Sequence, residues 1–176
     1  MDQVLSFAPV PRTWLFVLLA LVAAQRLLEL LLSRRHEAYL RGRGATEIGA
    51  GHYPFIVAVH AGWLAALALW AALMPPVLNP ALMVAYLLLQ PMRAWIIASL
   101  GRYWTTRIIT LPGAPLVRRG PYRFMRHPNY VLVVLEIAIL PLAVNAWPVA
   151  ILFSVLNALI LRVRINTENQ VLALRP

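Results

Sequence analysis

The sequence contains no cysteine, which excludes disulfides, thiolate nucleophiles, cysteine metal sites and iron–sulfur clusters. It also contains no lysine, so all 16 basic residues are arginine. Acidic residues are scarce, and 6 of them against 16 arginines give a formal net charge of +10. Charged residues make up only 12% of the chain, against about 25% in soluble domains. Such a shortage of charge is not typical of a soluble globular protein.

Apolar residues are abundant instead, at 61% of the chain with a mean hydropathy of +0.73. These values indicate an integral membrane protein. A transmembrane helix needs about 20 residues, so 176 residues leave room for four to six spans and one domain, residues 1–176. A charge of +10 would suggest nucleic acid for a soluble protein. Here the arginines flank apolar runs, so we expect topology anchoring in membrane lipids and no nucleic-acid partner.

Five apolar segments predict an all-α, polytopic membrane protein with about five transmembrane helices. The predicted spans are residues 14–32, 54–73, 81–100, 129–144 and 147–161. The first is expected to be a retained span rather than a cleaved signal. Ser33 to Gly51 is predicted to be a loop with a short amphipathic start, and residues 162–176 a short polar helix. The last two spans are each shorter than about 20 residues and form a C-terminal helical hairpin that turns at Asn145.

Arginines are concentrated in three segments: the loop after the first span, the stretch after the third, and the tail. They are Arg34, Arg35, Arg41 and Arg43; Arg102, Arg107, Arg118, Arg119, Arg123 and Arg126; and Arg162, Arg164 and Arg175. The turns at residues 75–80 and 145–146 carry none. The positive-inside rule therefore predicts an outside N-terminus and a cytoplasmic C-terminus, and we expect the bacterial cytoplasmic membrane.

Several charged or polar residues fall inside the predicted spans, where they are costly unless they have partners. Arg26 and Glu29 are three residues apart and predict an ion pair on one helix face. Glu136 also needs a partner, and Arg93 or a histidine such as His60 could supply it. A structural ion pair between spans and a catalytic role both remain open for Glu136.

The stretch Leu116 to Tyr130 is the polar interruption of the chain, with four arginines, a histidine, two X-Pro steps and two tyrosines. The arginine distribution places it on the same side of the membrane as Arg164 and Glu168, and the short hairpin would bring the two together. Guanidinium groups, a carboxylate and aromatic rings suit a cofactor that carries a carboxylate, an amine, a ribose and an adenine. We therefore expect a cytoplasmic cofactor pocket built from residues 116–130 and 162–172.

Three motifs carry a family resemblance: Gly-Pro-Tyr at 120–122, Arg-His-Pro-x-Tyr at 126–130, and Arg-x-x-x-Glu at 164–168. In this order around a hydrophobic hairpin, they resemble the isoprenylcysteine carboxyl methyltransferase family of integral membrane enzymes. The resemblance covers residues 101–172. It implies that S-adenosylmethionine binds in the cytoplasmic pocket and that a lipophilic acceptor enters from the bilayer. The cofactor-binding residues that it implies are Tyr122, Arg126, His127, Pro128, Tyr130, Arg164 and Glu168.

The chain departs at two positions from the pattern of family members that methylate prenylcysteine. Members that act on prenylcysteine typically have a second glutamate where this chain has Asn169, and a glycine where it has Leu132. The run at 102–107, the His-Pro-Asn-Tyr run at 127–130 and Glu136 resemble more closely a bacterial branch that O-methylates long-chain alkylpyrones and alkylresorcinols. We expect that acceptor class. The alternatives are carboxyl methylation of a prenylcysteine-like substrate and, in a different class, a non-enzymatic membrane transport or assembly subunit.

The expected reaction is in-line attack of an acceptor oxygen on the sulfonium methyl group. A carboxylate needs only positioning, whereas a phenol with a pKa of about 10 benefits from a general base or a stabilising cation. Glu136, His60 and Arg93 are the candidate catalytic residues, and His52 and Trp104 the candidate substrate-binding residues. We expect no metal, and the sequence does not indicate an oligomeric state.

Overall fold

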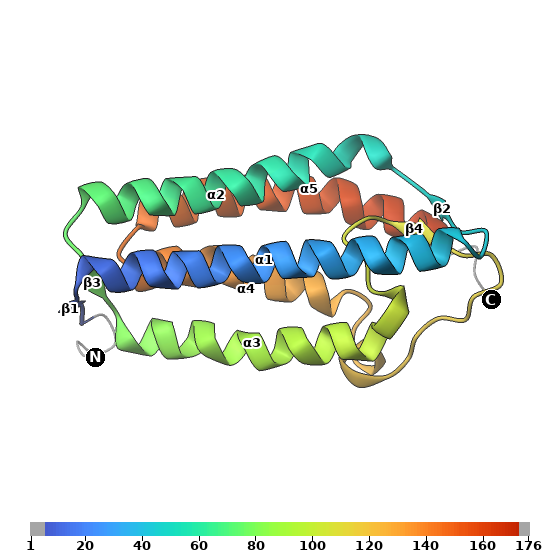
Figure 1. The fold of residues 1–176 in the computed structure, drawn as a ribbon, viewed down its shortest axis with the longest axis horizontal. Helices are drawn as coiled ribbons and strands as arrows, with labels where there is room; N and C mark the ends of the chain where they lie inside the picture. The colour runs from blue at the N-terminus through green and yellow to red at the C-terminus, as the bar shows by residue number, and fades with distance from the viewer. Residues whose placement is uncertain (1–5, 173–176) are drawn as a thin grey trace.

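The computed structural model describes residues 6–172, with side chains described up to Gln170. Predictions that fall on residues 1–5 and 173–176, including the place of Arg175 in the arginine count, lie outside the described residues. The described part is a bundle of helices that run along one long axis (Figure 1). These helices are α1 (Arg12–Arg41), α2 (Tyr53–Leu73), α3 (Pro80–Leu100), α4 (Pro128–Ala143) and α5 (Trp147–Leu172). The predicted all-α, polytopic membrane architecture is confirmed.

Helix length separates α4 from the other four. The helices α1, α2, α3 and α5 are long and apolar enough to cross a membrane. Helix α4 has 16 residues, which span about 24 Å at about 1.5 Å per residue, less than the roughly 30 Å of a hydrocarbon core. Of the about five predicted transmembrane helices, the described residues therefore contain four candidate spans and a shorter apolar helix, α4, which is the first arm of the predicted hairpin.

The predicted end of the first helix is wrong. Helix α1 continues past Leu32 to Arg41, through residues that we expected to be a loop. The described part of the tail is helical as predicted, and it continues α5 past Leu161 without a break. Residues 33–41 contain no glycine or proline, so nothing in the backbone stops the helix before Gly42. The end of an apolar run marks where a span leaves the bilayer and not where its helix stops. Both helices therefore extend into the charged end of the bundle.

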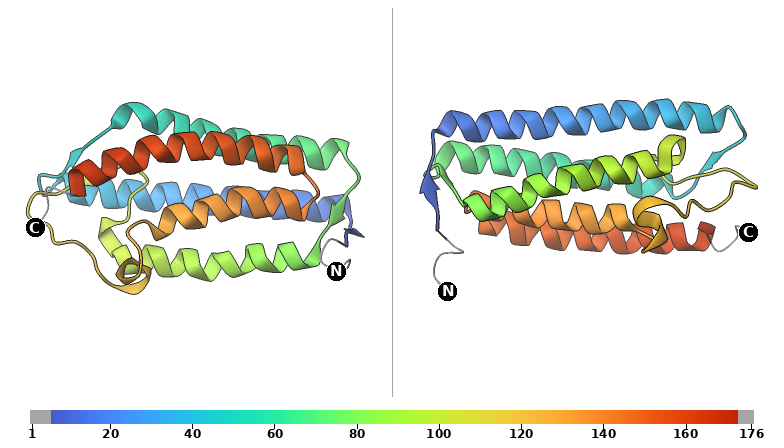
Figure 2. Two further views of the ribbon diagram at one scale, coloured as in Figure 1. Left: turned by 180° about the vertical axis from the view of Figure 1, so that it is seen from behind. Right: turned by 90° about the horizontal axis from the view of Figure 1, so that it is seen from below.

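Short strand pairs close the two ends of the bundle. Strand β1 (Ala8–Pro9) pairs antiparallel with β3 (Val77–Leu78), and β2 (Thr46–Glu47) pairs antiparallel with β4 (Ile109–Thr110). The β1–β3 pair lies at the end where the chain begins, and the β2–β4 pair at the end where it finishes (Figure 1). The other views show the same arrangement, with the α2–α3 and α4–α5 turns at the β1–β3 end (Figure 2).

The bundle contains a large apolar core cluster, and its outer faces are apolar as well. Trp63 and Leu140 are almost completely buried, and the Trp63 indole donates a hydrogen bond to the backbone oxygen of Ile137 at 3.3 Å. Large apolar side chains also cover the outside; Leu28 and Leu88, for example, are 66% and 67% exposed. Because water would not favour so many exposed apolar side chains, these faces are suited to contact lipid.

Candidate functional site

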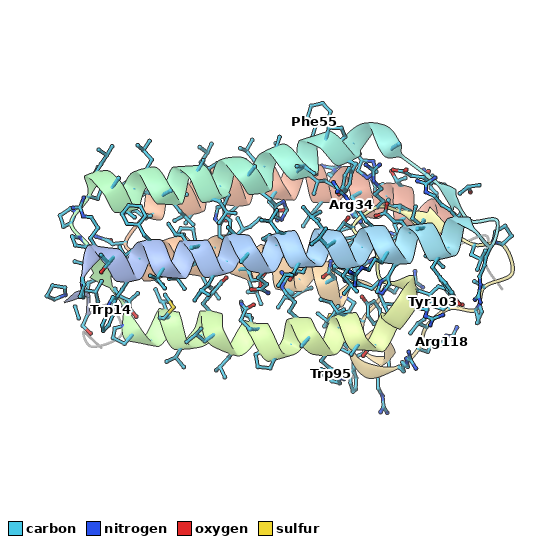
Figure 3. All side chains as sticks on the ribbon, viewed as in Figure 1. Trp14, Arg34, Phe55, Trp95, Tyr103 and Arg118 are labelled. Atoms are coloured by element: carbon cyan, nitrogen blue, oxygen red, sulfur yellow. The ribbon has the colours of Figure 1, made fainter. Side chains whose placement is uncertain are left out.

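Charged side chains gather at the β2–β4 end of the bundle. Arg34 and Arg118 lie at this end, Trp14 lies at the opposite end, and Phe55 and Trp95 lie on outer faces (Figure 3). A cavity of about 810 Å³ opens among the elements of the charged end. Small-molecule sites typically have volumes of about 300–1,000 Å³, so this cavity is large enough for a cofactor-sized ligand.

The cavity has two kinds of wall. Its apolar lining comes from the end of α1, the end of α3 and the loop before α4: Leu40, Leu100, Ile108, Ile109, Leu111, Leu116 and Val117. Its polar lining includes the residues around the start of α4 and the end of α5: Tyr122, Arg126, His127, Asn129, Tyr130, Arg164, Glu168 and Asn169. Such a cavity can hold a polar group and an apolar chain side by side.

The polar wall is built around the Tyr130 hydroxyl. This hydroxyl donates a hydrogen bond to the Glu168 carboxylate and accepts one from Arg164 Nε at 2.8 Å. The rings of His127 and Tyr130 stack with centroids 5.2 Å apart, and His127 Nδ1 lies 3.8 Å from Glu168 Oε2. The structure thus brings the Arg-His-Pro-x-Tyr and Arg-x-x-x-Glu motifs into one cluster.

The 3₁₀ turn η3 (Gly120–Arg123) is fixed against the end of α3. Gly120 has φ +57 and packs against the side chains of Ser99 and Trp95, where a Cβ atom would collide. Arg119 Nε donates to the backbone oxygen of Ser99 at 2.6 Å. This packing holds Tyr122 in the polar wall. Burial, with a contribution from the Glu168 charge, raises the pKa of Tyr122, so its hydroxyl stays protonated.

Three predicted binding residues do not line the cavity. Pro128 is buried as the first residue of α4, where its fixed φ and missing N–H suit a helix start. His52 ends the turn η1 (Ala50–His52). Trp104 is buried, and its backbone oxygen accepts a hydrogen bond from His36 Nδ1 at 2.7 Å. These residues support the elements around the cavity, but the structure does not place them in its wall.

The three candidate catalytic residues also lie outside the cavity lining. Glu136 is almost completely buried and accepts hydrogen bonds from Arg93 Nε at 3.0 Å and from Arg26 at 2.8 Å. Arg93 and Arg26 also bind Glu29, at 3.0 Å and 2.9 Å. His60 Nδ1 instead bonds to the backbone oxygen of residue 56 at 2.8 Å. The predicted Arg26–Glu29 and Arg93–Glu136 pairs are both present, as parts of one cluster that joins α1, α3 and α4.

Sequence reasoning missed a second group of contacts, next to the apolar wall. Arg107 lines the cavity and donates to Glu47 at 2.5 Å, and Arg41 donates to the same carboxylate at 2.5 Å. Burial alone would raise the pKa of Glu47, but the hydrogen bonds from Arg107 and Arg41 lower it overall. The group ties β2 to the segment that supplies Ile108 and Ile109. The acidic residue Glu47, in a sequence segment rich in arginine, was the signal that could have predicted these contacts.

Asn129 and Asn169 lie within the predicted pocket segments, but they were not singled out as binding residues. Asn169 Oδ1 lies 3.0 Å from His127 Nε2, between the end of α5 and the start of α4. Asn129 Oδ1 is buried and has no hydrogen-bond partner among the described residues. Asn129 occupies the unspecified position of the Arg-His-Pro-x-Tyr motif, and its place in the His-Pro-Asn-Tyr run did not indicate a binding role.

The site can now be compared with known proteins. The family model described as the isoprenylcysteine carboxyl methyltransferase (ICMT) family matches residues 81–174, which include both motifs of the polar wall. The chain belongs to this family. An uncharacterized protein of Bacillus subtilis (strain 168), YpbQ, is 39% identical over 160 residues, which cover 89% of this chain and 95% of the relative.

A second relative is an uncharacterized protein of Haemophilus influenzae, 28% identical over 158 residues that cover 88% of this chain and 92% of its own. No solved structure matches the chain. Members of the isoprenylcysteine carboxyl methyltransferase family are membrane methyltransferases that use S-adenosylmethionine. Membership therefore identifies the class of this protein as a membrane methyltransferase.

The residues of the cavity fit this cofactor. Glu168 offers a carboxylate for an amine or hydroxyl, Arg126 a guanidinium for a carboxylate, and Tyr122 an aromatic ring for a base. The buried Asn129 oxygen without a partner adds an acceptor that protein groups leave unused. Buried polar atoms normally have hydrogen-bond partners, so the unpaired oxygen of Asn129 is consistent with a polar ligand.

Proposed function

We propose that this protein transfers a methyl group from S-adenosylmethionine to an oxygen atom of a long-chain lipophilic acceptor. The observation that carries the proposal is the cluster of His127, Tyr130, Arg164 and Glu168 in one wall of a cavity whose other wall is apolar. The polar wall suits the methyl donor, and the apolar wall suits the alkyl part of the acceptor. The two substrates would then lie next to each other.

The bound cofactor supplies an electrophilic methyl group on its sulfonium. The protein's part is binding and orientation. In this proposal Arg126 binds the cofactor carboxylate, Glu168 binds the amine or a ribose hydroxyl, and the rings of Tyr122 and His127 pack near the adenine. The Tyr130 hydroxyl and Arg164 hold Glu168 in place through the bonds described above.

The charge of the cavity indicates that the acceptor oxygen is anionic or readily ionised. Among the described residues, five arginines and one carboxylate, that of Glu168, line the cavity. The arginines are Arg107, Arg118, Arg123, Arg126 and Arg164. A positive environment stabilises an oxygen anion and so favours ionisation of an acidic hydroxyl. A hydroxypyrone or resorcinol ring with a long alkyl chain satisfies both walls, and we propose this acceptor class.

The carboxylate of a prenylcysteine-like acceptor is a second candidate, because it is also anionic and lipophilic and is consistent with the family. The residue at 169 favours the first candidate: it is asparagine, whereas members that act on prenylcysteine typically have glutamate there. Ionisation by the arginines requires no side-chain base in the cavity. A catalytic role for Glu136, His60 or Arg93 stays a prediction.

The orientation proposal follows from the two ends of the bundle. The arginines of the loops after α1 and α3 and of α5 lie at the β2–β4 end, while Arg12 begins α1 at the other end. Under the positive-inside rule the cavity faces the cytoplasm of a bacterial cell, with the N-terminus outside and the C-terminus inside. The cofactor would then enter from the cytoplasm and the acceptor from the bilayer.

Cofactor binding tests the proposal directly. We expect the detergent-solubilised protein to bind S-adenosylmethionine in a calorimetric titration, and His127→Ala and Glu168→Ala to lose most of the affinity. Phe55→Leu, on an outer face, serves as the control and should bind normally. Arg164→Lys should also weaken binding, because lysine cannot reproduce the Nε–H that binds Tyr130. A non-enzymatic transport or assembly subunit predicts no cofactor binding by any of these proteins.

The acceptor is tested separately. Purified protein with labelled S-adenosylmethionine would be offered an alkylresorcinol, an alkylpyrone and a farnesylcysteine analogue, each in the same detergent. The proposal predicts labelled methyl ether from the first two at rates well above that of methyl ester from the third. Preferential labelling of the farnesylcysteine analogue would favour the second candidate.

A further inference from the structure

Asn129 lines the cavity and carries a hydrogen-bond acceptor that no described group uses. The described buried side-chain atoms without a hydrogen-bond partner are Arg26 Nε, Tyr86 Oη and Asn129 Oδ1. Of these three residues, only Asn129 is part of the cavity lining. It lies in the first turn of α4, next to Pro128 and Tyr130. A buried polar atom without a partner is unfavourable in the empty protein, so a ligand group that supplies the missing bond would gain affinity.

Neighbouring groups of the polar wall are already engaged. The Tyr130 hydroxyl binds Glu168 and Arg164, and His127 Nε2 lies at hydrogen-bond distance from Asn169. None of these bonds uses Asn129 Oδ1, although Asn129 lies between His127 and Tyr130 in the chain. The hydrogen-bonding capacity of this oxygen is therefore not used by the neighbouring groups of the polar wall.

We propose that the Asn129 carboxamide is a binding residue for the methyl donor, with its oxygen accepting a hydrogen bond from an N–H or O–H group of the ligand. The inference rests on the proposed function and goes beyond it by assigning the unspecified position of the motif. S-adenosylmethionine carries suitable donors in its ammonium group, its ribose hydroxyls and its adenine amino group. An ionised acceptor oxygen carries no proton and could not donate to Asn129 Oδ1.

The orientation of the amide matters to this argument, because exchanging its oxygen and nitrogen preserves its shape. In the reversed orientation an NH₂ group would take the place of the oxygen, and it would suit the anionic oxygen of the methyl acceptor instead. An aspartate at 129 distinguishes the two: it keeps a hydrogen-bond acceptor at this place and removes the donor. A leucine of similar size removes both.

The experiment compares Asn129→Leu, Asn129→Asp and the control Val131→Leu, whose side chain is exposed on the same helix and does not line the cavity. Two quantities are measured in detergent: the Kd of S-adenosylmethionine by titration, and the Tm of the ligand-free protein. We expect Asn129→Leu to raise Kd about tenfold, the loss of one well-placed hydrogen bond, and Asn129→Asp to keep Kd within about threefold.

The Tm of the ligand-free protein distinguishes a binding role from a structural one. If Asn129 only supported the fold, Asn129→Leu would lower this Tm. Because leucine removes an unpartnered buried oxygen, we expect the Tm of Asn129→Leu to equal or exceed that of the unmodified protein. A lower Tm together with a higher Kd would show that Asn129 supports the fold, and would overturn the inference.

Other outcomes separate this inference from the proposed function. If the unmodified protein does not bind S-adenosylmethionine, the proposed function fails. If it binds but Asn129→Leu binds equally well, only the inference fails. If Asn129→Asp leaves Kd unchanged but raises the KM of the methyl acceptor about tenfold, the amide contacts the acceptor and the assignment to the methyl donor is overturned.

Discussion

His127 at the start of α4 and Asn169 near the end of α5 lie across from each other, with Nε2 and Oδ1 3.0 Å apart. Because a carbonyl oxygen accepts, His127 Nε2 carries the proton in this bond, and Nδ1 is directed toward Glu168 at 3.8 Å. The pair therefore sets the orientation and tautomer of a ring that stacks on Tyr130. It also joins the two arms of the hairpin at the cavity.

Asn169→Ala tests this relationship. Without the amide, the His127 ring can rotate, and we expect affinity for S-adenosylmethionine to fall several-fold, corresponding to about 0.5–1.5 kcal/mol for one hydrogen bond. Asn169→Glu restores an acceptor and should recover most of the affinity. The control is Gln170→Ala, an exposed neighbour outside the cavity lining. Equal titration curves for Asn169→Ala and the unmodified protein would show that the His127–Asn169 bond has no part in binding.

Gly120→Ala should disturb the polar wall. The residue has φ +57, and an added Cβ would overlap the Ser99 hydroxyl and lie 3.2 Å from Trp95 Nε1. We expect the free energy of unfolding to fall by about 1–3 kcal/mol, which is measured as a lower Tm. We also expect weaker cofactor binding, because η3 must move away from α3. Gly51→Ala is the matched control, since nothing lies within 4 Å of its added Cβ.

A second variant separates the two causes in Gly120→Ala. Adding Ser99→Gly removes the overlapping hydroxyl but leaves the unfavourable positive φ, so it should restore part of the lost Tm and affinity. Thermal unfolding and titration of the single and double variants measure both effects. A Gly120→Ala protein that matches Gly51→Ala in both measurements would mean that η3 is not fixed as described.

Glu136→Gln tests whether the buried cluster is structural or catalytic. The carboxylate binds both Arg93 and Arg26, so losing its charge leaves two buried guanidinium groups with Glu29 as their remaining partner. We expect a loss of about 3–5 kcal/mol in the free energy of unfolding, seen as a lower Tm in detergent. Cofactor Kd below the transition should be unchanged because Glu136 does not line the cavity.

Methyl-transfer rates for the same variant decide the catalytic hypothesis. A protein that keeps its Tm and its cofactor Kd but transfers no methyl group would support Glu136 as a catalytic residue. A lower Tm for Glu136→Gln, together with a normal methyl-transfer rate at low temperature, would support the structural role.

We expect the contacts of Glu47 with Arg107 and Arg41 to stabilise the protein less as the pH falls. Hydrogen bonds from Arg107 and Arg41 lower the pKa of Glu47 below its ordinary value of 4.5 in the folded protein. Its contribution to stability is therefore complete above about pH 4.5 and is lost as the pH falls through the lower, folded pKa. Tm measured between about pH 7 and pH 3 should decline less steeply on the acid side for Glu47→Gln. Identical profiles for the two proteins would contradict the prediction.

Much of the fold follows from the pattern of apolar runs. Each of the five runs corresponds to a helix, and the predicted start of the fourth run at residue 129 lies within one residue of the start of α4 at Pro128. The end of α1, and the continuity of α5 with the predicted tail helix, could not be found this way, because hydropathy reports the bilayer boundary and the polar residues that follow are good helix formers. The arginine count placed the two motif segments at one end, and in the structure they form one cluster.

The sequence by itself determined that the protein is a helical membrane protein and that its Arg-His-Pro-x-Tyr and Arg-x-x-x-Glu motifs mark its family, because composition and spacing are properties of the chain. Only the tertiary structure decided which side chains line the cavity. Helices that are apolar on all sides show no preferred inner face, so their rotation is set by packing. That packing places Glu136 in a closed cluster and Asn129, for which the sequence predicted no binding role, in the cavity lining.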